Sequence, residues 1–218
     1  MKILKDILKS YLFPDRIKQA YGDKVRESIN KNSIDWEQRA IESSKSLIAA
    51  ICFKESATTL AEKTENLIFP PIGYYYSLFH LSVGLLKMDY SIELTELRNI
   101  HHKTLINLVE TKLIQPGIIS RDFLKHINTL KELRENCNYK FGFTEDLAKA
   151  LHNADKLTED CFDKGLIFLH QILEITNTRY RFQVSIGDHF GDDIIDTYLS
   201  GDDKERVWNY LSINSLTS

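Results

Sequence analysis

Residues 70–88 read PPIGYYYSLFHLSVGLLKM, and this stretch decides the fold. Two prolines suit the first turn of a helix, where a missing backbone N–H breaks no helical hydrogen bond. Behind them, apolar side chains recur at the spacing of one helix face: Tyr75, Phe79, Val83 and Leu86. Tyr76 and His80 form a second stripe beside the first. The stretch therefore predicts a buried core helix.

Helical spacing and turn residues place further elements on both sides of this helix. Ser33 is a candidate N-cap for a long preceding helix, and Ser120 for a following one. Between them, residues 115–117 (Gln-Pro-Gly) mark a turn. The expected helices cover residues 2–12, 14–30, from 33 onward, 70–88, 93–113, 120–137, 144–176, 189–200 and 202–213.

These elements predict an all-α fold with three parts. Residues 1–32 form an N-terminal helical pair, residues 33–177 the main set of helices, and residues 178–218 an acidic C-terminal extension. Within this extension, the segment 179–186 (RYRFQVSI) alternates polar and apolar residues. We expect it to be a short strand or an extended arm, which makes the extension mixed in structure.

Composition excludes several classes of protein. The 218 residues carry a net charge of −3, so the surface as a whole is not the strongly basic one of a DNA-coating protein. Three cysteines without paired spacing argue against a disulfide framework and a cysteine-rich zinc site. Charged residues interrupt the apolar N-terminus, and the uncharged stretch 66–86 suits a core helix better than a membrane span. We therefore expect a cytoplasmic protein without cofactor or metal.

An arginine interrupts the apolar face of the helix expected over 120–137. Arg134 lies at helical spacing in the same stripe as the apolar residues Phe123, Ile127, Leu130 and Cys137. An unpaired buried guanidinium costs several kcal/mol. Arg134 therefore needs either a carboxylate inside the bundle or a polar cleft that receives a phosphate. Asn138, four residues further on, shares this face.

Three segments, in this order, resemble small prokaryotic HEPN proteins: 75–80 (YYSLFH), 102–108 (HKTLINL) and 133–139 (LRENCNY). The resemblance implies an antiparallel bundle of four or five helices that is usually dimeric. In its catalytic members, an arginine and a following histidine from both protomers line a cleft that cuts RNA without a metal. Arg134 matches the arginine, and Tyr139 stands where those members have the histidine.

The replacement of histidine by Tyr139 shapes the expected site. A phenol with a pKa near 10 is a poor base at neutral pH, whereas an imidazole titrates near 6.5. His80 or His102 would supply the imidazole if the bundle brings either of them close to Arg134. The expected catalytic residues are thus Arg134, Tyr139, His80 and His102, and Asn138 and Tyr76 are expected to bind the substrate.

Three functions stay open on the sequence. The first is a metal-independent endoribonuclease of a toxin–antitoxin or defence system, in which Arg134 holds the scissile phosphate. The second is a non-catalytic module that binds nucleotide or RNA, or that partners a small nucleotidyltransferase. In family members of this kind a tyrosine near the motif can be nucleotidylated, and Tyr139 is the candidate. The third is a structural homodimerisation module.

Overall fold

A computed structural model describes residues 15–31, 33–63, 68–137, 146–190 and 205. All regular structure within these residues is helical. The elements are α2 (Asp15–Lys31), α3 (Ser33–Lys63), α4 (Phe69–Lys87), the 3₁₀ helix η1 (Leu94–Leu97), α5 (His102–Leu108), the π-helical turn η2 (Val109–Ile114), α6 (Arg121–Glu135), α7 (Asp146–Thr176) and α8 (Arg179–Phe190).

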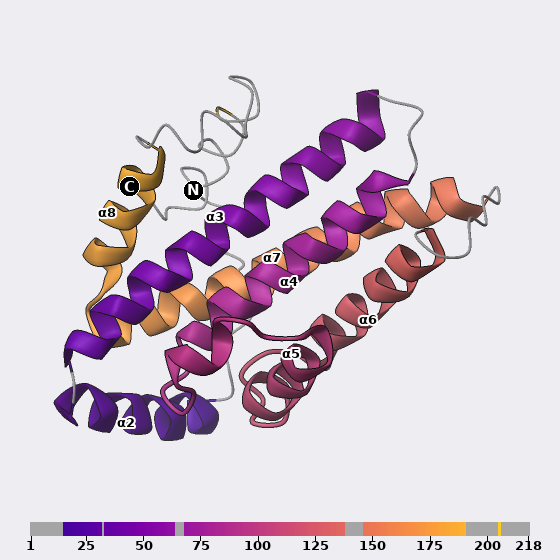
Figure 1. Ribbon diagram of the computed structural model, residues 1–218. Helices are drawn as coiled ribbons and strands as arrows, with labels where there is room; N and C mark the ends of the chain where they lie inside the picture. The colour runs from indigo at the N-terminus through magenta and orange to yellow at the C-terminus, as the bar shows by residue number, and fades with distance from the viewer. Residues whose placement is uncertain (1–14, 32, 64–67, 138–145, 191–204, 206–218) are drawn as a thin grey trace.

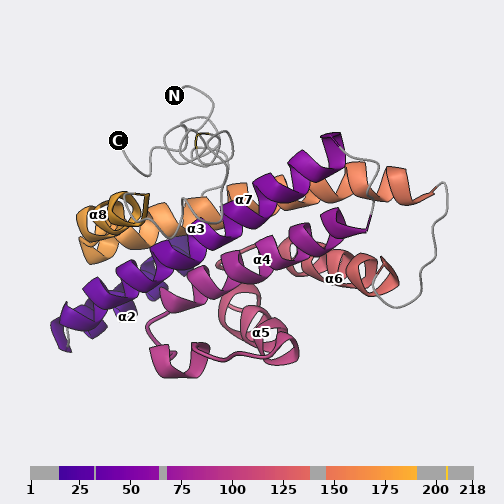
Figure 2. The same ribbon diagram turned by 45° about the horizontal axis from the view of Figure 1, so that its top comes forward.

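The long helices lie side by side as a bundle with α4 at its centre. In Figures 1 and 2, α3 and α4 run in opposite directions, with α6 beside α4 and α7 behind both. Helix α4 contacts α3, α5, α6 and α7. Helix α2 packs on α7 and α3, and α8 packs on α3 and α7. The predicted all-α architecture is confirmed for the described residues.

Helix α4 is the core helix that the sequence predicts. Pro70 and Pro71 occupy its first turn, and Tyr74, Tyr75 and Leu78 are each at most 1% exposed. No side-chain hydrogen bond caps its start. Among the described helices, none combines the length and the apolar composition that crossing a bilayer requires.

The backbones of α3 and α4 approach each other closely at Gly73. A Cβ atom on Gly73 would lie 2.8 Å from the Cβ atom of Ala57 and 3.2 Å from the carbonyl oxygen of Phe53. Real side chains do not sit this close, so one of the helices would have to move. Glycine at this position therefore sets the distance between the two helices that make the most extensive contact in the bundle.

Replacing Gly73 by alanine is expected to destabilise the protein by up to about 2 kcal/mol. Overpacking of a tight contact costs about 1–3 kcal/mol, and the better helix propensity of alanine offsets only about 1 kcal/mol of this. Urea denaturation measures the change. The matched control is Gly22→Ala in α2, where the nearest atoms to an added Cβ are 3.9 Å away. This control should be neutral or stabilising; equal stability of the two variants would contradict a tight contact at Gly73.

The single helix predicted over 93–113 is wrong. The chain forms η1, then an extended residue at His101, then α5, and continues into η2. The π-helical turn rotates the helix face, because each of its turns holds an extra residue. Val109, Leu113 and Ile114 are all buried as a result. The predicted turn at residues 115–117 is confirmed, and Gly117 adopts the positive φ of 77° that glycine tolerates.

The strand or extended arm predicted for residues 179–186 is also wrong, because this segment begins helix α8. The sequence alternates over a few residues, but Phe182 and Ile186 are four apart and both 0% exposed. Helical spacing therefore decides the structure here, and burial against α3 and α7 fixes it. The described part of the C-terminal extension is helical, not mixed.

One hydrophobic core runs through the described helices, from Val25 in α2 to Ile186 in α8. The division into three domains at residues 32 and 177 stays a prediction. The expected helix over 2–12 lies outside the described residues, as does most of the pair expected over 189–213.

Candidate functional site

Three polar side chains from three helices meet beside α4. Tyr75 lies on the buried stripe of α4, His102 is the first residue of α5, and Arg134 lies near the end of α6. The rest of Arg134's stripe is buried, as its apolar spacing predicts: Phe123, Ile127, Leu130 and Cys137. The stripe turns Arg134 towards α4, and the short helix α5 brings His102 to the same place.

Tyr75 contacts both of the other residues. The guanidinium carbon of Arg134 lies 4.7 Å from the centre of the Tyr75 ring, which is the geometry of a cation–π contact. The phenol oxygen of Tyr75 is 2.7 Å from Nδ1 of His102 and forms a hydrogen bond with it. Tyr75 therefore joins a cation to an imidazole, and we call these three residues the Arg134–Tyr75–His102 group.

Arg134 has few partners for a guanidinium in this position. Its side chain is 12% exposed, and its Nε is buried without a hydrogen-bond partner in the described part of the chain. The nearest carboxylate oxygen, on Glu135, is 3.8 Å from Nη2, which is too long for a hydrogen bond. Among the described residues, the structure thus gives Arg134 an aromatic face and a distant carboxylate, and no hydrogen-bond partner for Nε.

Burial and nearby positive charges lower the pKa of the His102 imidazole. Burial lowers the pKa of His102 below its usual range, and the positive charges of Arg134 and Lys131 lower it further. His102 is therefore neutral at pH 7. Burial raises the pKa of Tyr75 to about 12, although Arg134 opposes the shift, so this phenol stays protonated. A neutral imidazole held by a phenol and flanked by a cation is a suitable proton acceptor.

Aromatic rings extend the site along α4. The ring centres of Phe79 and His102 are 4.8 Å apart, and those of Tyr76 and His102 are 5.9 Å apart. Phe53 of α3 stacks on Tyr76 and lies almost parallel to His80, at an interplanar angle of 10°. Phe53 is 38% exposed. Rings of this kind at a surface provide faces on which bases can stack.

The structure brings some of the predicted site residues together. Arg134 and His102 meet around Tyr75, and Tyr76 borders them. His80 contacts Phe53 and Phe79 instead, and burial lowers its pKa. Asn138 and Tyr139 lie outside the described residues.

The sequence prediction missed Tyr75 as a site residue, because its place on the apolar stripe assigns it to the core. The available signal was its position in the segment YYSLFH (75–80), which resembles HEPN proteins. Phe53, sixteen residues before α4 begins, carried no signal of this kind.

Within the described segments, no group of three or more His, Cys, Asp or Glu side chains is placed to hold a metal ion. Comparison of the chain with models of protein families, with curated proteins and with solved structures gives no match. The geometry of the Arg134–Tyr75–His102 group is therefore the basis of the functional argument.

Proposed function

We propose that this protein is a HEPN-like RNA-binding protein and that the Arg134–Tyr75–His102 group cleaves RNA without a metal ion. The observation that carries the proposal is the contact of Tyr75 with both Arg134 and His102. It places a partly unsatisfied guanidinium beside a neutral imidazole. Phosphate binding needs the first of these groups, and proton abstraction needs the second.

Each residue has a separate role in the proposed reaction. Arg134 binds the phosphate and stabilises the charge that develops on its oxygens. His102 takes the proton of the adjacent 2′-hydroxyl through Nε2 and becomes an imidazolium, whose Nδ1–H keeps its proton and donates a hydrogen bond to the Tyr75 oxygen. The 2′-oxygen then bonds to phosphorus and the bond to the 5′-oxygen breaks, and this leaving oxygen takes a proton from solvent. The products are a 2′,3′-cyclic phosphate and a 5′-hydroxyl.

The surroundings of the group support a single-stranded substrate. The rings of Phe79 and Tyr76 lie beside the ring of His102, and Phe53 stacks on Tyr76. Stacking of bases on such rings requires unpaired bases. Lys131 adds positive charge next to His102. These features suit RNA although the net charge of the whole chain is −3.

Replacing Arg134 by alanine is expected to slow RNA cleavage about 100- to 1,000-fold, because it removes a donor to the transition-state charge. The assay incubates purified protein with labelled single-stranded RNA in the presence of EDTA. The matched control is Arg121→Ala, at the exposed start of the same helix, which should cleave as the wild type does. Absence of cleavage by the wild type, or equal cleavage rates for the two variants, would contradict the proposed ribonuclease activity.

A non-catalytic module that binds nucleotide or RNA, or partners a nucleotidyltransferase, is the second candidate. It is favoured by Tyr139, which stands in the position of the family's histidine. If this function is correct, the protein binds RNA in a manner that depends on Arg134 but does not cleave it. Homodimerisation belongs to both proposals, and light scattering coupled to size-exclusion chromatography tests it.

A further inference from the structure

A pocket of about 510 Å³ lies between α3, α4 and the segment that runs from η1 to Ile100. This volume is within the range of pockets that hold small organic ligands. Apolar side chains line it, among them Phe79 and Leu97. Polar side chains line it from α3, from α4 and from the segment after η1, and we call those of α3 and α4 its polar wall. An aromatic ring beside fixed polar groups suits a planar heterocycle.

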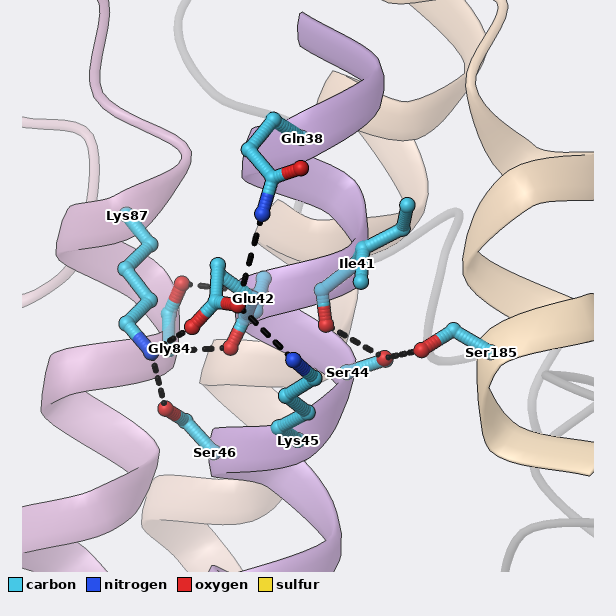
Figure 3. A network of polar contacts seen from close by, with 10 residues as sticks. Gln38, Ile41, Glu42, Ser44, Lys45, Ser46, Gly84, Lys87 and Ser185 are labelled. Atoms are coloured by element: carbon cyan, nitrogen blue, oxygen red, sulfur yellow. Dashed lines mark hydrogen bonds and ion pairs between the residues drawn. The ribbon is translucent and has the colours of Figure 1, made fainter. Parts of the chain in front are cut away.

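The polar wall is built around Glu42 and Lys87. Nζ of Lys87 donates to the carbonyl oxygen of Glu42 at 2.9 Å and to Oγ of Ser46 at 3.0 Å, and it lies 3.4 Å from the Glu42 carboxylate. Gln38 and Lys45 also donate to this carboxylate (Figure 3). These contacts hold the carboxylate in place, and Glu42 remains 30% exposed and lines the pocket.

A carboxylate beside an ammonium presents an acceptor next to a donor. Among the nucleobases, guanine alone offers two neighbouring N–H donors, N1–H and the 2-amino group, that one carboxylate can accept together. Its O6 can accept from Lys87 in place of the long 3.4 Å contact to the Glu42 carboxylate. Adenine and cytosine offer only their amino group at this edge, and uracil offers one N–H between two acceptors. The pair therefore matches guanine better than any other base.

The pocket and the Arg134–Tyr75–His102 group share a wall. Phe79 lines the pocket, and its ring centre is 4.8 Å from that of His102. His80, which also lines the pocket, is 5.6 Å from Phe79 between ring centres. A base that stacks in the pocket against Phe79 is therefore separated from His102 by one aromatic ring.

We propose that this pocket binds the guanine base of a nucleotide next to the phosphate that Arg134 holds. The inference rests on the proposed function and gives that function a base preference: the protein recognises guanosine in single-stranded RNA. A free guanine nucleotide has the same recognition edge and therefore binds to the same pocket.

Calorimetric titration with 5′-GMP, 5′-AMP, 5′-CMP and 5′-UMP tests the pocket without any cleavage. We expect 5′-GMP to bind at least about ten-fold more tightly than the other three, as one paired hydrogen-bond contact to a base provides. Glu42→Gln should remove this preference, because an amide cannot accept both guanine protons. The matched control is Glu37→Gln on the same helix, whose carboxylate pairs with Arg181 of α8 outside the pocket. It should bind as the wild type does.

Ile100→Trp gives a second test that leaves the Glu42–Lys87 pair in place. Ile100 lines the pocket and is half-buried, so a larger ring there should fill the space and abolish 5′-GMP binding. Equal affinity for the four nucleotides, or a preference that survives both Glu42→Gln and Ile100→Trp, overturns the inference.

Mapping of cleavage sites on mixed-sequence RNA separates the two proposals. Selective 5′-GMP binding without cleavage supports the pocket and contradicts the ribonuclease. Cleavage without preference for guanosine supports the ribonuclease and contradicts the pocket.

Discussion

Replacing His102 by alanine is expected to slow RNA cleavage by about 100- to 10,000-fold, the usual contribution of a positioned general base. RNA binding should change little, because Arg134 and the aromatic rings remain. Cleavage depends on His102 because its hydrogen bond of 2.7 Å to Tyr75 fixes the imidazole and its lowered pKa keeps the imidazole neutral. Cleavage of labelled RNA and binding by fluorescence anisotropy measure the two effects separately.

The adjacent histidine provides a matched control for this experiment. His101 is exposed and has an extended backbone, so His101→Ala should cleave RNA at the wild-type rate. A His102→Ala variant as active as His101→Ala would remove His102 from the mechanism, even if Arg134→Ala is inactive.

The pH dependence of cleavage gives an independent readout. In the proposed mechanism the neutral form of His102 is the active one, so the rate should rise with pH. Because the pKa of His102 is lowered, the inflection should fall below the ordinary value of about 6.5. In Arg134→Ala the inflection should move upward, since a neighbouring positive charge is gone. If the inflection of the wild-type protein lies above the pKa of an ordinary histidine, His102 is not the general base.

Replacing Arg39 by methionine is expected to lower the free energy of unfolding by about 3–5 kcal/mol, the usual effect of removing one member of a buried charge network. Arg39 is 3% exposed. Its Nη atoms donate to the carbonyl oxygens of Lys87, Asp89 and Ile92, and Nε donates to Asp35. Methionine fills similar space but leaves three carbonyl groups without these donors.

Urea denaturation with Arg181→Met as control measures this loss. Arg181 forms an exposed ion pair with Glu37, which contributes less than about 1 kcal/mol. A loss for Arg39→Met as small as for the control would mean that water replaces the arginine. Hydrogen exchange should also show that the turn after α4 opens more readily in Arg39→Met, because Arg39 ties this turn to α3.

Features that depend on local spacing could be predicted from the sequence. The inward position of Arg134 follows from its place among apolar residues of one helix, and the two prolines mark the start of α4. Tyr76 and His80 share a stripe because they are four residues apart. Local spacing misleads where two periods fit one short segment, as at residues 179–186, which form a helix.

Contacts between distant residues could not be predicted in this way. Tyr75 and His102 are 27 residues apart, and their hydrogen bond depends on how α5 is placed after the break at His101. Arg39 binds carbonyl groups about 50 residues further along the chain. The periodicity of the sequence does not indicate contacts over such separations, because only the packing of whole helices brings these residues together. The break between η1 and α5 decides which histidine meets Arg134.

Phe79 gives the proposed pocket and His102 a common boundary, and this has a thermodynamic consequence. A ligand that displaces the Phe79 ring changes the surroundings of the imidazole on its other side. Ligand binding and protonation of His102 are then linked equilibria, and each must alter the other by the same factor. An NMR titration of His102 with the pocket empty and filled would therefore report the coupling energy between ligand binding and protonation of His102 directly.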